Sequence, residues 1–245
     1  MLLEKCIIAF LLFTFFPSIP APIAKGFKPR TKYNETEARQ LIHLSAGAYS
    51  TSPQGCINVV FGKSANLYKL FSSSDLLCDF VNSTCSSYIL VNEQQKRVYV
   101  VFRGTETIQQ LILEGYESHA AKVNFFNVGL ANAYFAHALE VLWPNVQEVF
   151  KNPRFKNYDF TFTGHSLGAA LAALAALKTV VTGLRPDGSR IHLVTFGEPR
   201  VGNIILAQKF DKLLPYAFRV VHADDVVPQL SKCAKDNPTK NANGS

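Results

Sequence analysis

The residues with the clearest chemical potential lie in the stretch Gly164-His165-Ser166-Leu167-Gly168, which fits the pattern G-x-S-x-G. In this pattern a serine occupies a sharp turn between a strand and a helix, with its hydroxyl exposed at the carboxyl end of a sheet. The two glycines lack a Cβ, so the helix can begin close to the strand. A serine held in this way is a candidate nucleophile for acyl transfer. The alternative is a turn that only connects a strand to a helix.

An acyl-transfer site also needs donors for the developing oxyanion and a carboxylate that orients a base. The backbone of Leu167, directly after the serine, supplies one donor. Thr105, in the stretch RGTE that follows a strand-like segment, is a candidate for the second donor or, alternatively, a helix cap. Asp224 and Asp225 follow a further predicted strand, where an aspartate orients an imidazole or simply forms a turn.

Alternating strands and helices surround these residues and predict an α/β fold. Apolar residues alternate in the segment before Ser166, and an alanine-rich helix follows it. The segment RVYVVF is apolar on both faces, which predicts a central strand. If the sheet is parallel, the carboxyl ends of its strands meet at one edge, with Ser166 and Asp225 both there. The predicted strands are Arg97–Phe102, Tyr158–Thr163, Arg190–Phe196 and Tyr216–His222.

Outside this central region, local patterns predict the remaining elements. A capping-box-like N-E-T-E starts a helix at Asn34. The apolar segment Ile57–Phe61 predicts a short strand. Leu130–Asn152 predicts a long helix that Pro144 kinks or divides. Val201–Leu214 predicts a helix with Ile205, Phe210 and Leu213 or Leu214 facing inward.

The amino terminus carries an apolar run of 11 residues, Cys6–Phe16. Such a run is too short to span a bilayer and is typical of a signal peptide. We therefore expect residues 1–21 to be a signal peptide, residues 22–245 to form one domain, and the protein to be secreted or lumenal. An uncleaved anchor is the alternative.

The composition is that of a globular protein, with 48% hydrophobic and 18% charged residues. The net charge of +7 comes from scattered Lys and Arg, without the clustered stripe that nucleic-acid binding requires. The charge indicates a solvated surface, with attraction to anionic membranes as a weaker option. No metal site and no organic cofactor is predicted.

Five cysteines are present, and Cys6 falls in the predicted signal peptide. An even number in an exported domain favours disulfides. Cys78 with Cys85 is the favoured bridge, and Cys56 with Cys233 follows by elimination. Two sequons, at Asn34 and Asn82, are candidate glycosylation sites.

Four motifs together resemble one known family. They are VFRGTE (residues 101–106), TGHSLGAALA (163–172), TFGEPRVGN (195–203) and HADDVVPQL (222–230). In this order and spacing they resemble the class 3 lipases, the fungal and plant triacylglycerol lipases with an α/β-hydrolase fold, and most of all the secreted nematode members. The resemblance implies a mostly parallel central sheet with helices on both faces.

The resemblance also implies functions for individual residues. Ser166 would be the nucleophile and Asp225, immediately before Val-Val-Pro, the acid of the catalytic triad. Thr105 and Leu167 would donate to the oxyanion, and Thr107–Gly115 would be the lid segment. Acylglycerol esters at a lipid–water interface would be the substrates, with no protein partner and no nucleic acid implied.

The sequence departs from the family pattern at two places. Asn127–Leu130 stands where the family usually has a His-x-Gly-Phe element. The family's triad histidine lies beyond the aspartate, but all six histidines here precede Asp225. His165 should point away from the serine, and His222 would have to reach across a sheet edge. Without a base, a serine hydroxyl is a poor nucleophile.

Three hypotheses follow from these departures. The chain is an acylglycerol hydrolase truncated at its carboxyl end, and weak or inactive in this form. Alternatively it is a non-catalytic, lipase-like protein that binds lipid. A hydrolase of another ester class, such as a carbohydrate-linked ester, differs only in the lining of the cleft.

Overall fold

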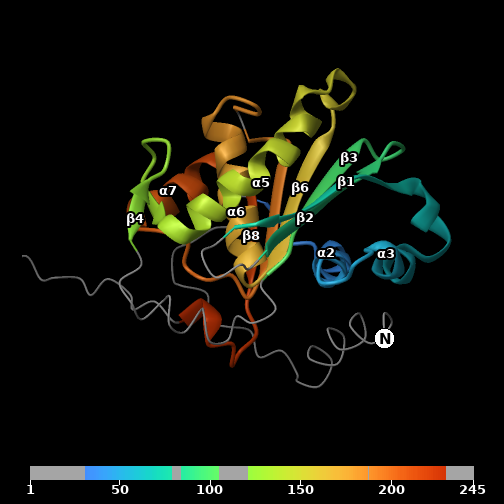
Figure 1. Cartoon of the computed structure of the whole chain (residues 1–245), viewed down its shortest axis with the longest axis horizontal. Coiled ribbons are helices and arrows are strands. Elements are labelled where there is room, and N and C mark those ends of the chain that lie inside the picture. Colours follow the sequence, from blue (N-terminus) through green and yellow to red (C-terminus); the bar gives the residue numbers. More distant parts are fainter. Residues whose placement is uncertain (1–30, 79–83, 105–120, 187, 230–245) are drawn as a thin grey trace, which may run out of the picture.

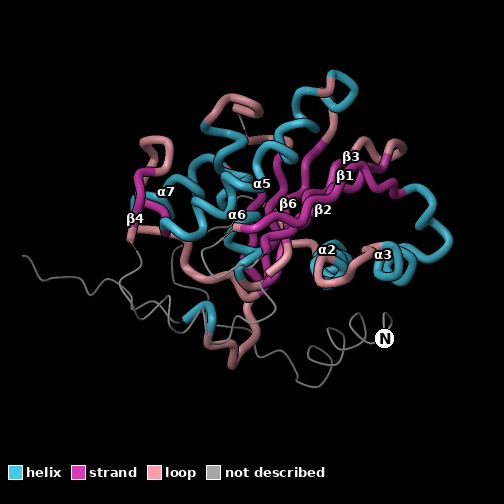
Figure 2. Tube along the Cα trace, viewed as in Figure 1, coloured by secondary structure: helices cyan, strands magenta, loops and turns pink. Residues whose placement is uncertain are grey.

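A six-stranded sheet with helices on both faces forms the centre of the protein (Figure 1, Figure 2). The structure is a computed structural model that describes residues 31–78, 84–104, 121–186 and 188–229. The strand order is β1-β2-β3-β6-β7-β8. The strands are β1 (Tyr68–Leu77), β2 (Thr84–Asn92), β3 (Arg97–Phe102), β6 (Asp159–His165), β7 (Ile191–Phe196) and β8 (Tyr216–Val220).

The sheet is mostly parallel, as the family resemblance implies. β1, β2 and β3 pair antiparallel, whereas β3, β6, β7 and β8 all run in the same direction. In this register Phe102 lies beside Gly164, and His165 lies beside Phe196. The carboxyl ends of these strands therefore meet at one edge of the sheet, the edge where the candidate site residues lie.

The helices divide between the two faces of the sheet. α2 (Glu35–Gly47) packs on one face against β3, β6 and β7. α5 (Ala133–Lys151) and α6 (Leu167–Val181) pack on the other face, and α7 (Ile204–Leu213) contacts α6. Smaller elements are α3 (Gln54–Phe61), the hairpin strands β4 (Lys122–Asn124) and β5 (Leu130–Asn132), and three 3₁₀ turns, η1 (Gly62–Leu67), η2 (Pro153–Phe155) and η3 (Val227–Gln229). In the part of the chain that is described, no helix is both long enough and apolar enough to cross a bilayer.

The α6 helix lies in the centre of the core. It is apolar all round, and every residue from Leu167 to Val180 is buried. A helix of this kind is stable only when other elements cover all its sides, here the sheet and α5. Its one buried cation, Lys178, is paired with Glu140 of α5 at 2.6 Å and lies 4.4 Å from the Trp143 ring.

The other face is fixed by a partly buried carboxylate on α2. Glu37 accepts hydrogen bonds from Arg97 of β3 at 2.7 Å and from the Tyr216 hydroxyl of β8 at 2.8 Å. The His192 ring of β7 lies 3.7 Å away. Burial acts to raise the pKa of Glu37, but these three partners together lower it to about 2. One side chain thus connects α2 to three strands of the sheet.

Two predicted elements are wrong in type or extent. Ile57–Phe61 is part of helix α3, because a short apolar run does not distinguish a helix from a strand. The predicted helix at Leu130 begins only at Ala133, since the three residues before it pair with β4.

Two details inside the helices also differ. Pro144 does not divide α5, which is one helix, and buried residues on both sides of the proline, such as Leu142 and Val146, hold it against the core. In α7 the buried residue is Leu206, whereas Ile205 is 53% exposed.

Candidate active site

Ser166 occupies the turn between β6 and α6. Its backbone has φ 57° and ψ −123°, a left-handed conformation that residues other than glycine rarely adopt. The Ser166 N–H donates to the Phe196 carbonyl at 3.0 Å, and the Ser166 carbonyl accepts from Ala169 at 3.0 Å. These bonds, to the neighbouring strand and to the first turn of the helix, hold the serine in a strained conformation.

The two flanking glycines allow this turn because the backbones around them are in direct contact. A Cβ on Gly164 would lie 2.3 Å from the Gly168 carbonyl oxygen. A Cβ on Gly168 would lie 2.3 Å from the carbonyl oxygen of Phe102, the last residue of β3. Both contacts are with backbone atoms, which cannot rotate away. The start of α6 therefore packs against two strands at a distance that only glycine permits.

The Ser166 hydroxyl makes no hydrogen bond to any residue that the structure describes. The serine is 7% exposed. Leu167 is the first residue of α6, so its backbone N–H has no carbonyl partner within the helix, as at every helix start. Thr105, the other candidate oxyanion donor, and the predicted lid segment Thr107–Gly115 both lie outside the described residues.

A tyrosine that the sequence did not single out lies beside this turn. The Tyr49 hydroxyl is 3.1 Å from His165 Nδ1. A Cβ on Gly104 would lie 2.1 Å from the same hydroxyl oxygen and 2.9 Å from the His165 carbonyl oxygen. Tyr49 thus contacts both the residue before the serine and the residue before Thr105. No spacing pattern points to it, because it follows the end of α2 and the contact arises only in the folded chain.

Asp225 also lies at this edge of the sheet. Its Oδ1 accepts from the Val227 N–H at 2.9 Å. A Cβ on Gly197, which has φ 55°, would lie 2.7 Å from Asp225 Oδ2 and 3.6 Å from His165 Nε2. The Asp225 carboxylate and the His165 ring therefore both lie beside the backbone of Gly197, which has no side chain to separate them. Asp224 precedes Asp225 in the turn after β8.

The His165 imidazole is the titratable group next to the serine in the chain. Burial lowers its pKa, and the nearby Asp225 carboxylate raises it by less, so the pKa lies below the ordinary value of 6.5. The ring is hydrogen-bonded to Tyr49 through Nδ1. His222 lies farther along the chain, where its carbonyl accepts from the Asp225 N–H at 3.1 Å.

A second residue that the sequence reasoning missed is Glu198, in the loop after β7. Its carboxyl group is buried and accepts from the Thr195 hydroxyl at 2.5 Å. Burial raises the pKa of Glu198 to about 7, while the Thr195 hydrogen bond and the Arg219 charge act in the opposite direction. Arg219 donates to the Glu198 carbonyl at 2.8 Å and to the Pro228 carbonyl at 3.1 Å. It thereby connects the Gly197 loop to the segment that carries Asp225.

The cysteines and sequons are placed as follows. Cys78 and Cys85 form the disulfide that the sequence favoured, and it closes the loop between β1 and β2. Cys56 is also disulfide-bonded, whereas Cys233 lies outside the described residues, so that pairing stays a prediction. Asn34 is exposed and caps α2 by accepting from the Glu37 N–H at 3.1 Å. The second sequon, Asn82, is not among the described residues.

The described residues include no group of three or more His, Cys, Asp or Glu side chains arranged to hold a metal ion. A groove of about 470 Å³ lies between the β4–β5 hairpin and α5, with Phe125, Phe126, His137 and Glu140 among its lining residues. Ser166 is not part of that lining.

A strained serine between a parallel strand and a buried helix, with a carboxylate at the same sheet edge, is the arrangement of an α/β-hydrolase. The family model "Lipase (class 3)" matches residues 99–235, more than half of the chain. The chain belongs to the class 3 lipase family, and its fold is that of an α/β-hydrolase.

Individual relatives agree with this assignment. The chain is 46% identical to Lipase ZK262.3 of Caenorhabditis elegans over 217 residues, which are 87% of this chain and 61% of that protein. It is 32% identical to the secreted mono- and diacylglycerol lipase 1 of Fusarium solani, over 59% of this chain and 42% of that protein. Among solved structures, lipase II from Rhizopus niveus superimposes with a TM-score of 0.62 at 26% identity, covering 79% of this chain and 73% of that one. The chain thus spans less than two thirds of the length of the two curated relatives.

Proposed function

We propose that this chain is a carboxylic-ester hydrolase of acylglycerol lipids, with Ser166 as the nucleophile and Asp225 as the triad acid. Leu167 and Thr105 are the proposed oxyanion donors. The observation that carries the proposal is the strained, glycine-flanked turn at Ser166 on the sheet edge that also holds the Asp225 carboxylate. Membership of the lipase family and the similarity to mono- and diacylglycerol lipases support the substrate class.

No side chain among the described residues is hydrogen-bonded to the Ser166 hydroxyl, so none of them is placed to act as the base of the triad. His165 precedes the serine in the chain, but its ring is hydrogen-bonded to Tyr49 through Nδ1. None of the six histidines follows Asp225. Removing the histidine of a serine hydrolase costs on the order of 10⁶ in kcat. We therefore expect weak turnover by the 245-residue chain, limited by the missing imidazole.

Chemical rescue with free imidazole tests this mechanism. The 245-residue chain and its Ser166→Ala variant are assayed on a short-chain diacylglycerol and on a soluble aryl ester, with imidazole titrated into both. Imidazole supplies the missing base, so it should raise the turnover of the unsubstituted chain several-fold above that of the Ser166→Ala variant. The variant also measures direct hydrolysis by imidazole. The matched control is Ser72→Ala on edge strand β1, because the Ser72 hydroxyl is buried and has no hydrogen-bond partner among the described residues.

Equal turnover of the unsubstituted chain and Ser166→Ala at every imidazole concentration would exclude Ser166 as the nucleophile. Turnover without imidazole that Ser166→Ala abolishes would instead point to a substitute base in the chain itself. A preference for the aryl ester or a carbohydrate-linked ester over diacylglycerol would indicate another ester class.

The alternative function is non-catalytic lipid binding. It is favoured by the absence of a hydrogen bond between the Ser166 hydroxyl and any described side chain. Binding of diacylglycerol with no turnover, with or without imidazole, would support it.

We also propose that the protein is exported, with residues 1–21 as its signal peptide. The Cys78–Cys85 disulfide supports an oxidising compartment. Glycosylation of Asn34 is compatible with its exposure, because its side-chain oxygen caps α2 and leaves the amide nitrogen for the sugar.

A further inference from the structure

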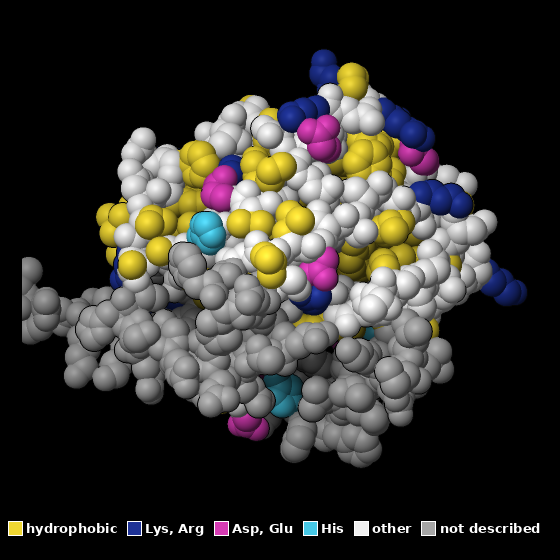
Figure 3. All heavy atoms as spheres, in the orientation of Figure 1, with side chains coloured by type: hydrophobic (Ala, Val, Ile, Leu, Met, Phe, Trp, Pro, Cys, Tyr) yellow, Lys and Arg dark blue, Asp and Glu magenta, His cyan; other side chains and the backbone are white. Residues whose placement is uncertain are grey.

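Two neighbouring elements expose large apolar side chains on the same part of the surface. We call this surface the hairpin–α7 face. Its members, with their exposed fractions, are Val123 (39%), Phe126 (43%), Leu130 (40%), Ile204 (66%) and Ile205 (53%). Figure 3 shows hydrophobic side chains gathered over the β4–β5 hairpin, at the left of that view.

Two hydrogen bonds between Leu130 and Asn203 connect the hairpin to α7. Asn203, the N-cap of α7, donates its N–H to the Leu130 carbonyl at 2.9 Å, and its side-chain oxygen accepts from the Leu130 N–H at 3.1 Å. A Cβ on Gly129 would lie 2.6 Å from the Leu206 backbone nitrogen. Leu130 and Ile204 therefore belong to one continuous surface.

The tip of the hairpin has a fixed shape. Phe126 and Asn127 both have positive φ, 48° and 58°. The Asn124 side chain holds this turn, since it accepts from the Asn127 N–H at 3.0 Å and donates to the Asn127 side chain at 2.7 Å. The buried Lys178 lies 5.3 Å from the Phe126 ring. Phe126 is thus exposed from a turn whose conformation these hydrogen bonds stabilise.

Basic side chains outnumber acidic ones on the hairpin and α7, with Lys122, Lys209 and Lys212 against Asp211. The sequence contains no Asp or Glu from residue 122 to 139 or from 199 to 210. Lys122 and Lys209 lie in these segments, and neither forms an ion pair with another described residue. The nearest acid along α5, Glu140, is paired with Lys178. An apolar surface bordered by lysines is complementary to a surface that is both apolar and anionic.

The hairpin–α7 face is also connected to the candidate active site. Phe196, whose carbonyl accepts from Ser166, begins the loop that passes Gly197 and reaches Asn203 at the start of α7. This loop is the covalent connection between the strand beside Ser166 and the start of α7.

We propose that the hairpin–α7 face docks the protein on an anionic phospholipid surface. The proposal rests on the proposed function, because a hydrolase of acylglycerol lipids has to reach a lipid surface. A membrane fits better than a protein partner for a chemical reason. The exposed groups are hydrocarbon, and the polar groups of the tip, Asn124 and Asn127, are bonded to each other, so the face offers few directional contacts that a protein would recognise.

Sedimentation with vesicles tests the proposal. The 245-residue chain is mixed with vesicles of phosphatidylcholine alone and of equal parts phosphatidylcholine and phosphatidylglycerol. Binding should be stronger to the anionic vesicles and should weaken as salt is added. The double variant Ile204→Ser, Ile205→Ser should lose about tenfold or more in partitioning, because two large aliphatic side chains no longer enter the interface. Serine is well tolerated in the first turn of a helix, so this variant should fold.

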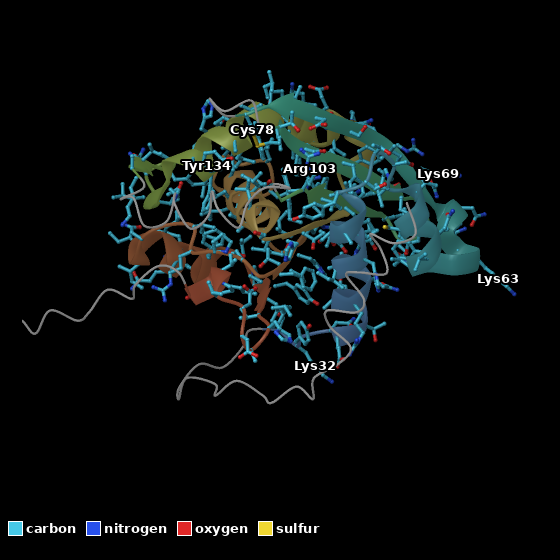
Figure 4. The ribbon with its side chains drawn as sticks, turned by 60° about the horizontal axis from the view of Figure 1, so that its bottom comes forward. Lys32, Lys63, Lys69, Cys78, Arg103 and Tyr134 are labelled. Atoms are coloured by element: carbon cyan, nitrogen blue, oxygen red, sulfur yellow. A yellow bond between two sulfur atoms is a disulfide. The ribbon has the colours of Figure 1, made fainter. Side chains whose placement is uncertain are left out.

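Lys209→Gln should weaken binding to the anionic vesicles about fivefold and leave binding to phosphatidylcholine unchanged. Two matched controls lie elsewhere, Val59→Ser on α3, where Val59 is 58% exposed, and Lys63→Gln. Lys63 lies at the end of the molecule opposite the hairpin and α7 (Figure 4). Both controls should bind vesicles like the unsubstituted chain.

Equal binding to both vesicles, or equal losses for the double variant and Val59→Ser, would overturn the proposal. Absence of vesicle binding would do the same, and would leave a protein as the occupant of this face. Ser166→Ala should bind vesicles normally, so the docking result does not depend on turnover. Failure of the imidazole rescue with intact vesicle binding would therefore refute only the catalytic mechanism.

Discussion

The Glu37 cluster gives the sharpest stability prediction, because one carboxylate joins α2 to three strands. Its pKa of about 2 lies roughly 2.5 units below the ordinary value of 4.5. At about 1.4 kcal/mol per pH unit, this corresponds to about 3.5 kcal/mol of stabilisation at neutral pH, or about 2 kcal/mol after allowance for solvent screening of a partly buried group. Glu37→Gln should lower the free energy of unfolding by about that amount at pH 7.

The pH dependence has a definite sign. The pKa of Glu37 is lower in the folded than in the unfolded state, so its stabilisation is complete above about 4.5 and disappears as the pH falls towards about 2. The difference in unfolding free energy between the unsubstituted chain and Glu37→Gln should therefore shrink over this range. Urea unfolding followed by circular dichroism at several pH values measures it.

The matched control is Glu35→Gln, two residues earlier on the same helix. The Glu35 side chain is 66% exposed and pairs only with Arg39, an exposed i,i+4 contact, among the described residues. Its substitution should change stability by less than about 0.5 kcal/mol. If Glu37→Gln costs no more than Glu35→Gln at pH 7, or if its cost is the same at pH 7 and pH 3, the reasoning is wrong.

Two further predictions concern the elbow and the Gly197 loop. Gly168→Ala should destabilise the fold by about 2 kcal/mol or more, because the new Cβ meets the Phe102 backbone. The control Gly55→Ala, whose new Cβ has no atom within 4 Å, should be neutral or slightly stabilising. Equal melting temperatures for the two variants would contradict the packing argument. Glu198 has a pKa raised by burial to about 7, above its unfolded value of 4.5, so the unsubstituted chain should lose about 2–3 kcal/mol of stability as the pH rises from 4.5 to 7. Glu198→Gln should lack this loss. If the difference in unfolding free energy between Glu198→Gln and the unsubstituted chain stays constant from pH 4.5 to 7, the reasoning about Glu198 is wrong.

Much of the fold could be predicted because the relevant patterns are local. The segment before Ser166 alternates with the period of a strand, and the alanine-rich run after it is long enough for a helix. RVYVVF is a short, β-branched apolar run, typical of a strand buried on both faces. A parallel sheet then brings the ends of β3, β6, β7 and β8 to one edge by geometry alone. The strand predicted at Ile57–Phe61 was wrong because helix and strand bury the same few side chains over so short a segment.

The sequence by itself determined the kind of fold, the strained turn at Ser166 and the cysteine pair Cys78–Cys85, since each depends on residues that are neighbours or nearly so. Only the tertiary structure decided that Tyr49 bonds His165 and that the Asp225 carboxylate packs on Gly197. These contacts join residues that are tens to more than a hundred positions apart, and no local pattern encodes which of them meet. The same reason applies to the hairpin–α7 face, because a helical pattern that should bury Ile205 leaves it exposed once Leu206 fills the core.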